Sequence, residues 1–255
     1  MVRGVDVTCT RFVQMRWISS LCIILRMPGQ ICNGLKRQSP TMPASYNQIS
    51  IDKYRSRADG YDDSAQLTMP LRRRCIGLLR LKPGDVVVDV GAGTGLSYPL
   101  LLEAVGPTGR VLAFEQSPQM FAQAQARHAH QLDLNCRKQV WHQCVPAESV
   151  VLPEAADAVL FNYVHDIART PSAVANIMRQ LKPGARVAVA GMKFFPWWTG
   201  PLNLLAWAKN RPYNAQAADL WSPWDIIESY CTGFERQSTQ CGMGYIAWGT
   251  VKLTN

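Results

Sequence analysis

The stretch DVGAGTG, residues 89–95, contains the residue types with the clearest chemical purpose in this chain. An acid lies near the end of a valine-rich run, and glycines follow at every second position, Gly91, Gly93 and Gly95. Glycine adopts backbone angles that other residues avoid, and it lets a ligand approach the chain without meeting a Cβ atom. When a helix follows such a loop, its unpaired N–H groups face the same point. The pattern therefore predicts a ligand site at the end of a buried strand.

Two classes of nucleotide ligand fit a loop of this kind. A dinucleotide usually requires G-x-G-x-x-G, but here the sixth position is Leu96 and the third glycine comes one residue early, at Gly95. A second acid, Glu115, lies 20 residues beyond Gly95 at the end of the next predicted strand. A carboxylate there accepts both hydroxyl hydrogens of a ribose. Glu115 alone does not separate the two classes, because a nicotinamide enzyme also places an acid there.

The elements that position these residues alternate between strand and helix. Continuous or alternating apolar runs predict strands over 85–90, 109–115, 138–145, 156–164 and 185–192. Helices are predicted over 98–105, over 117–132 with Ser117 as N-cap and Pro118 in first position, and over 170–181 with Thr170 as cap. An antiparallel pair, 233–240 and 245–253, closes the chain. This alternation predicts a doubly wound α/β sheet with right-handed crossovers.

The full pattern D-x-G-x-G-x-G resembles that of the class I S-adenosylmethionine (SAM) methyltransferases. Three further stretches share the likeness: SPQMF at 117–121, LKPGARVAVA at 181–190 and YDDS at 61–64. The resemblance covers about residues 46 to 253, and the branch it favours contains the ubiquinone- and menaquinone-biosynthesis and small-molecule methyltransferases. It implies a Rossmann-like, seven-stranded, mostly parallel sheet with an antiparallel final strand, and SAM as the cofactor.

The resemblance also implies roles for particular residues. Asp89 would orient the amino group of the cofactor, Glu115 would bind the ribose, and Asn162 would face the sulfonium. The complete set of implied cofactor-binding residues is Tyr61, Asp89, Gly91, Ala92, Gly93, Gly95, Glu115, Gln116, Met120, Ala147, Glu148 and Asn162. For Asp89 the alternative is strand-end capping, and for Met120 it is plain helix packing.

One position departs from the family pattern. Where the family often has Asp-Ala-Glu after the third strand, this chain has Pro146, Ala147 and Glu148. Proline offers no side-chain acceptor for the adenine amino group. The backbone N–H of Ala147 is still expected to reach the ring, so we expect SAM to bind with one contact missing.

The candidate catalytic residues follow the fourth predicted strand, in FNYVHDI. They are Tyr163, His165 and Asp166. His165 is the best base by its ordinary pKa, although helix packing is the alternative for this histidine. An Asn/Asp-Pro-Pro-Tyr box is absent there, and the similar NRPY at 210–213 follows the fifth strand instead. With no basic and aromatic array, the chain is not expected to bind nucleic acid.

An aromatic-rich interval at 193–225 is the most individual feature of the chain. It lies between the fifth and sixth predicted strands, where related enzymes build a lid over the substrate, and we expect it to enclose the acceptor. Aromatic faces surround a cationic amine or stack on a flat ring, although they equally seat a lipid chain or pack a lid core. The expected substrate residues are His165, Trp197, Trp198, Trp207 and Tyr213.

The expected activity is in-line transfer of the SAM methyl group to a small-molecule acceptor, with an amine considered first. The alternatives are O- or C-methylation of a flat aromatic or lipid acceptor, aminocarboxypropyl transfer from SAM, and a non-catalytic SAM-binding scaffold. A nicotinamide oxidoreductase ranks behind all of these.

Composition adds bounds on the whole chain. The 255 residues fit one large domain, and we expect a methyltransferase domain over 42–255 after a non-domain extension at 1–41. The net charge of +9 is interpreted mainly as solubility charge. The eight cysteines form no C-x-x-C pair or zinc-ligand spacing, so we expect reduced thiols, no metal and a cytoplasmic location. No membrane span is expected, and the protein is expected to be a monomer or homodimer.

Overall fold

The computed structural model describes residues 68–195, 199–204 and 220–252. The predicted extension at 1–41 and most of the predicted lid lie outside these residues. So do Tyr61, Trp197, Trp198, Trp207 and Tyr213.

Seven strands form a single sheet in the order β3-β2-β1-β4-β5-β7-β6. Their bounds are β1 Val86–Val90, β2 Arg110–Glu115, β3 Val140–Cys144, β4 Ala156–Asn162, β5 Leu181–Met192, β6 Cys231–Thr239 and β7 Gly244–Val251. β1 pairs in parallel with both β2 and β4, whereas β7 runs antiparallel to β5 and to β6. The prediction of a mostly parallel, doubly wound sheet with an antiparallel final strand is confirmed.

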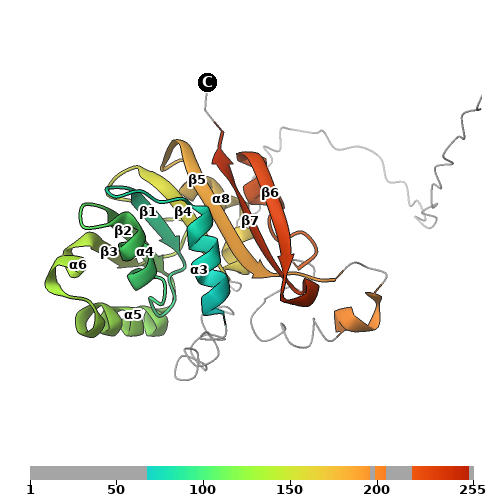
Figure 1. Cartoon of the computed structure of the whole chain (residues 1–255), viewed down its shortest axis with the longest axis horizontal. Coiled ribbons are helices and arrows are strands. Elements are labelled where there is room, and N and C mark those ends of the chain that lie inside the picture. The colour runs from blue at the N-terminus through green and yellow to red at the C-terminus, as the bar shows by residue number, and fades with distance from the viewer. Residues whose placement is uncertain (1–67, 196–198, 205–219, 253–255) are drawn as a thin grey trace, which may run out of the picture. The chain divides into compact units, whose positions relative to one another are not determined.

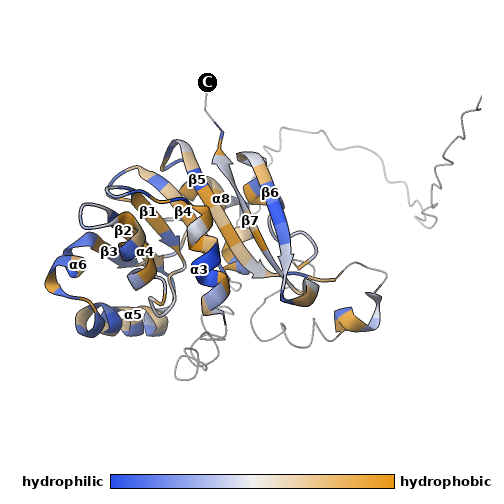
Figure 2. Cartoon of the chain, in the orientation of Figure 1, coloured by the Kyte–Doolittle hydropathy of each residue, from blue (hydrophilic) through white to orange (hydrophobic). Residues whose placement is uncertain are grey.

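Helices cover both faces of the sheet (Figure 1). On one face lie α3 (Met69–Leu78), α4 (Tyr98–Val105) and α5 (Pro118–Gln131), whose buried side chains join one core cluster. On the other face α8 (Pro171–Met178) and α10 (Asp225–Ser229) contribute to a second cluster. The central strands are hydrophobic and the edge strand β6 is largely hydrophilic, as Figure 2 shows. Each face of the sheet therefore has its own core.

β1 shows how the pleat divides its residues between these two cores. Its five residues are all buried, with Val86, Val88 and Val90 in the α8-side core and Val87 in the α3–α4 core. Successive side chains of a strand point to opposite faces, so Asp89 points to the same side as Val87. The acid of the glycine motif is therefore directed under α3 and α4, within the protein.

Several element boundaries differ from the predictions. The predicted strand at 138–145 is the shorter β3, because a short helix, α6 (Leu134–Gln139), precedes it. The side chain of Asp133 starts α6 by accepting the amide hydrogens of Asn135 and Cys136. Apolar periodicity gives no sign of this helix, since Leu134 is exposed and α6 has no buried residue.

The helix predicted at 170–181 also differs in two details. α8 ends at Met178, and β5 already begins at Leu181. Thr170 is the N-cap residue as predicted, but its side chain makes no capping bond. Its hydroxyl instead donates to the carbonyl of Asp166 at 2.7 Å.

Two further short elements are α7 (His165–Ala168) and the 3-10 turn η3 (Gln240–Gly242). Among the helices that the structure describes, none combines the length and the hydrophobicity that crossing a membrane would need.

Candidate functional site

The glycine loop follows β1 at the point where strand order reverses, with β2 on one side of β1 and β4 on the other. Ligands of open α/β sheets bind beyond the carboxyl ends of the strands at such a point. Gly91, Gly93 and Gly95 all have positive φ, at 57°, 59° and 78°. This is the left-handed region that glycine enters without a steric penalty.

The three glycines serve different purposes. A Cβ atom at Gly91 would lie 2.7 Å from Cγ1 of Val164, and one at Gly95 would lie 2.7 Å from the Tyr98 ring. At both positions neighbouring side chains of the protein leave no room for a Cβ atom. A Cβ atom at Gly93 would meet no described residue within 4 Å, so this glycine faces space that the described part of the chain leaves open.

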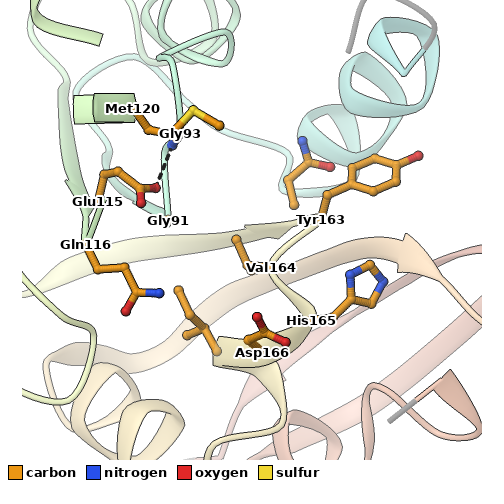
Figure 3. A pocket seen from close by; sticks show the side chains of 11 residues that line it. Gly91, Gly93, Glu115, Gln116, Met120, Tyr163, Val164, His165 and Asp166 are labelled. Atoms are coloured by element: carbon orange, nitrogen blue, oxygen red, sulfur yellow. Dashed lines mark hydrogen bonds between the residues drawn. The ribbon is translucent and has the colours of Figure 1, made fainter. Parts of the chain in front are cut away.

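Glu115 ties the glycine loop to the end of β2. Its carboxylate accepts the amide hydrogen of Gly93 at 3.0 Å and that of Ser117 at 2.8 Å (Figure 3). Burial raises the pKa of Glu115, and the hydrogen bonds from the Ser117 and Gly93 amides oppose the rise. Ser117 in turn caps α5, where Pro118 is in first position, as predicted. The carboxylate is thus held in a fixed orientation at the edge of the loop.

A single pocket gathers many of the predicted site residues at the carboxyl ends of β1, β2 and β4. Figure 3 shows Glu115 and Gln116 on one side of it and Tyr163 on the other, with His165 and Asp166 below. The described residues that line it are Gly91, Gly93, Glu115, Gln116, Met120, Asn162, Tyr163, Val164, His165, Asp166 and Ile167. The structure therefore brings together six of the twelve predicted cofactor residues with all three candidate catalytic residues.

Five predicted cofactor residues of the described chain do not line this pocket. They are Asp89, Ala92, Gly95, Ala147 and Glu148. Ala147 is buried in the core on the α8 side, and its carbonyl accepts a hydrogen bond from Asn176. Their roles stay predictions.

Asp89 is buried, and its Oδ2 atom has no hydrogen-bond partner among the residues that the structure describes. Burial raises the pKa of Asp89 to about 7, against the attraction of Arg72 and a hydrogen bond with Ser97. An unpaired buried carboxylate oxygen is costly in a protein interior. A polar atom of this kind beside a glycine loop suits a ligand that brings a hydrogen-bond donor.

Arg72 of α3 is the residue that the sequence analysis missed. It is buried, and its Nη1 donates to Oγ of Ser97 at 2.6 Å. When the Asn162 amide is oriented with its oxygen toward the guanidinium, as the donors of Arg72 require, that oxygen also accepts from Nη1, at 2.6 Å. A signal was present, because Arg72 lies at helical spacing from Cys75, Ile76 and Leu79, which form the buried face of α3.

The tip of β4 carries backbone strain. Tyr163 has a φ of 60°, a left-handed conformation that is unfavourable for a bulky residue. The turn in the backbone at Tyr163 ends β4 at Asn162, earlier than the predicted residue 164. The amide of Tyr163 still donates to the carbonyl of Ala190 at 2.8 Å. The Tyr163 hydroxyl lies 3.4 Å from Nε2 of Gln240. Strained non-glycine residues concentrate at functional sites, where the surrounding structure holds them in place.

His165 is fixed to the backbone of β5. Its Nε2 lies 2.7 Å from the amide nitrogen and 3.1 Å from the carbonyl oxygen of Met192, and a Cβ atom at Gly191 would lie 2.7 Å from the same nitrogen. Burial lowers the pKa of His165. Because Nε2 meets the Met192 backbone in either tautomer, this geometry favours packing over the general-base alternative. Asp166, the next residue, also lines the pocket.

The described aromatic residues of the 193–225 interval pack away from the pocket lining. Phe194 contacts the Trp221 ring, with centroids 5.0 Å apart. Trp224 packs against Tyr245 of β7 at 4.9 Å, and the guanidinium of Arg236 lies over it. Among the described residues of the interval, none lines the pocket, so the predicted enclosure of the acceptor stays a prediction.

The residues that are present fit SAM as a ligand. The open side of Gly93 accommodates close approach, and Glu115 keeps lone pairs for ribose hydroxyls. The unpartnered Oδ2 of Asp89 suits the ammonium of an amino-acid end.

Comparison with known proteins agrees with this fit. Residues 87–184 match the model of a methyltransferase domain. The chain is 33% identical over 116 residues to a protein-L-isoaspartate O-methyltransferase of Aeropyrum pernix, covering 46% of this chain and 42% of that protein. It is 26% identical to a demethylmenaquinone methyltransferase of Symbiobacterium thermophilum, over 71% of this chain and 79% of that protein.

A third relative is a 2-phytyl-1,4-naphtoquinone methyltransferase of Synechococcus elongatus, 30% identical over 48% of this chain and 52% of that protein. The chain thus spans about half the length of the first and third of these relatives. Among solved structures, a SAM-dependent methyltransferase from Aquifex aeolicus aligns with a TM-score of 0.58 at 20% identity, covering 77% of this chain and 97% of that one. At this identity the likeness establishes the fold. Residues 87–184 therefore form a class I SAM-dependent methyltransferase domain, of the branch that includes quinone and other small-molecule methyltransferases.

Proposed function

We propose that this protein transfers the methyl group of SAM to a small-molecule acceptor, and that the acceptor is an amine. The observation that carries the first part is the convergence of the glycine loop, Glu115 and the tip of β4 on one pocket. When bound, SAM supplies an electrophilic methyl group on a sulfonium. The protein has to align the acceptor with that group and to exclude water.

Charge in the pocket supports an amine. Two carboxylates, Glu115 and Asp166, are among the lining residues, and no described lysine or arginine is among them. Glu115 is tied to the glycine loop and to the start of α5, on the cofactor side, whereas Asp166 follows β4 beside Tyr163 and His165, and we assign Asp166 to the acceptor side. A carboxylate attracts an ammonium ion and accepts its proton before the nitrogen lone pair attacks. Tyr163, which lines the same pocket, adds an aromatic residue of the kind that a cation can contact.

A screen of acceptors with methyl-labelled SAM tests the proposal. Amines, phenols, quinols and thiols are incubated with the full-length protein, and labelled products are counted alongside S-adenosylhomocysteine. Methylated amine with stoichiometric S-adenosylhomocysteine supports the proposal. Methylthioadenosine as the product would show aminocarboxypropyl transfer. Methylation of phenols or quinols alone would support methyl transfer but contradict the proposal that the acceptor is an amine.

Asp166→Asn provides the matched variant. It is isosteric, and it removes the negative charge without changing the cofactor loop. We expect kcat/KM for an amine to fall about tenfold or more, in the range of one charge-assisted hydrogen bond. The dissociation constant of S-adenosylhomocysteine should change less than about twofold, because Asp166 is not among the predicted cofactor residues. Unchanged turnover of amines would remove Asp166 from the acceptor site.

A further inference from the structure

Arg72 differs from its two neighbours in the run of three arginines at 72–74. Arg72 is buried against the sheet, whereas Arg73 and Arg74 are exposed on the outer side of α3. A guanidinium taken out of water is unfavourable unless it is paired and hydrogen-bonded. Its partners therefore indicate what this charge does in the molecule.

Its two hydrogen-bond partners, and one acid that its charge attracts, belong to three different parts of the cofactor site. Ser97 lies at the end of the glycine loop, where α4 begins, and accepts from Arg72 at 2.6 Å. Asn162 is the last residue of β4 and lines the pocket. Asp89 lies in β1 on the side facing α3, and the attraction of Arg72 acts against the rise of its pKa on burial. One side chain of α3 thus connects the glycine loop, β1 and β4.

The contact with Arg72 fixes which way the Asn162 amide points. A guanidinium carries only N–H donors, so the amide oxygen has to face it. In that orientation the oxygen lies 2.6 Å from Nη1 and 3.2 Å from Nη2 of Arg72. The N–H₂ group is then the polar part that Asn162 offers to a ligand in the pocket. A sulfonium would be stabilised by an oxygen, so this orientation does not suit the role that the family resemblance implies for Asn162.

We propose that Arg72 is a positioning residue for the amino-acid end of SAM. It turns Asn162 into a hydrogen-bond donor, and its positive charge attracts the Asp89 carboxyl group beside the glycine loop. Asn162 then meets the carboxylate of the methionine part, and the unpartnered Oδ2 of Asp89 meets its ammonium group. This inference rests on the proposed use of SAM, and it adds a residue outside the glycine motif that sets how the cofactor is held.

The test compares two ligands that differ at this end. S-adenosylhomocysteine carries the carboxylate and the ammonium, and methylthioadenosine carries neither. Their dissociation constants are measured by calorimetry, with ligand-observed NMR for affinities in the millimolar range. For Arg72→Met we expect S-adenosylhomocysteine to bind about tenfold more weakly or worse, the scale of one charge-assisted hydrogen bond, while methylthioadenosine changes less than about threefold. Arg73→Met, on the exposed side of the same helix, is the matched control and should change neither.

Asn162→Asp keeps the test open if Arg72→Met does not fold. The aspartate has the same shape and still accepts from Arg72, so the buried arginine stays paired, but the N–H₂ donor is gone. We expect the same selective loss of S-adenosylhomocysteine binding, with the thermal unfolding midpoint preserved.

Two outcomes would overturn the inference. An equal loss for both ligands would show that Arg72 merely supports the loop, and unchanged binding of both would show that it has no part in the site. These results are distinct from failure of the proposed function. In that case the unmodified protein itself would bind neither S-adenosylhomocysteine nor methylthioadenosine.

Discussion

Asp89→Asn should make the ligand-free protein more stable at neutral and alkaline pH, although it removes a predicted cofactor contact. The native carboxyl is buried with one oxygen unpaired, and its pKa is raised from 3.8 to about 7. The unfolded chain ionises this group from about pH 4 upward, whereas the folded chain resists ionisation until about pH 7. Between these values the folded state binds more protons than the unfolded state, so Asp89 makes stability fall as pH rises.

The size of the effect follows from the same shift. A difference of about 3 pH units, from 3.8 to about 7, corresponds to at most about 4 kcal/mol at about 1.4 kcal/mol per unit. Asparagine does not ionise, so the variant escapes this penalty. The stability difference between variant and parent should be small near pH 4, grow through pH 5 and 6, and level off above about pH 7.

Urea unfolding at a series of pH values measures this difference directly. Comparing two proteins at each pH cancels the contributions of all other titrating groups that they share. The variant should also bind S-adenosylhomocysteine more weakly, because the acceptor for its ammonium group has lost its charge. A stability difference that stays constant from pH 4 to pH 8, or a variant less stable than the parent at pH 8, would refute the reasoning.

Three other substitutions test parts of the site. Gly91→Ala should destabilise the fold by about 1–3 kcal/mol in chemical unfolding, since its Cβ would lie 2.7 Å from Val164 at a φ of 57°. Gly93→Ala should destabilise it by only about 1 kcal/mol, because its Cβ would meet no described residue within 4 Å. Glu115→Gln should weaken S-adenosylhomocysteine binding about tenfold or more by calorimetry, because a neutral amide cannot accept from both ribose hydroxyls and both backbone amides; an unchanged dissociation constant would move the ribose elsewhere. His165→Gln should lower thermal stability without removing a limb from the pH profile of kcat/KM, since Nε2 is bound to β5; loss of the acid limb would restore the base role.

Much of the fold follows from local signals in the sequence. The continuous apolar run at 86–90 indicates a strand buried on both faces, and the glycines after it indicate a left-handed loop. Glu115 is predictable because it ends the next strand, whose parallel pairing with β1 brings it to the loop. Ser117 and Pro118 define the start of α5 by capping chemistry alone.

The parts that escaped prediction depend on contacts between residues far apart in the chain. Arg72 is buried because Ser97 and Asn162, 25 and 90 residues later, supply its acceptors, and nothing in the LRRRC stretch announces them. The tie between His165 and Met192 likewise appears only when β4 and β5 are adjacent. The short helix α6 lacks a buried face, so no apolar period marks it.

The position of β7 between β5 and β6 makes the cofactor site depend on the C-terminal strand. β6 precedes β7 in sequence, yet within the described sheet it is joined to β5 only through β7. The same insertion supports the helix that carries Arg72, since α3 packs on β5 and β7. During synthesis, that arginine therefore reaches its final surroundings only once residues 244–251 have left the ribosome and paired with β5, at 172 to 179 positions after Arg72. We therefore expect the growing chain to bind SAM only late in synthesis, after β7 has paired with β5.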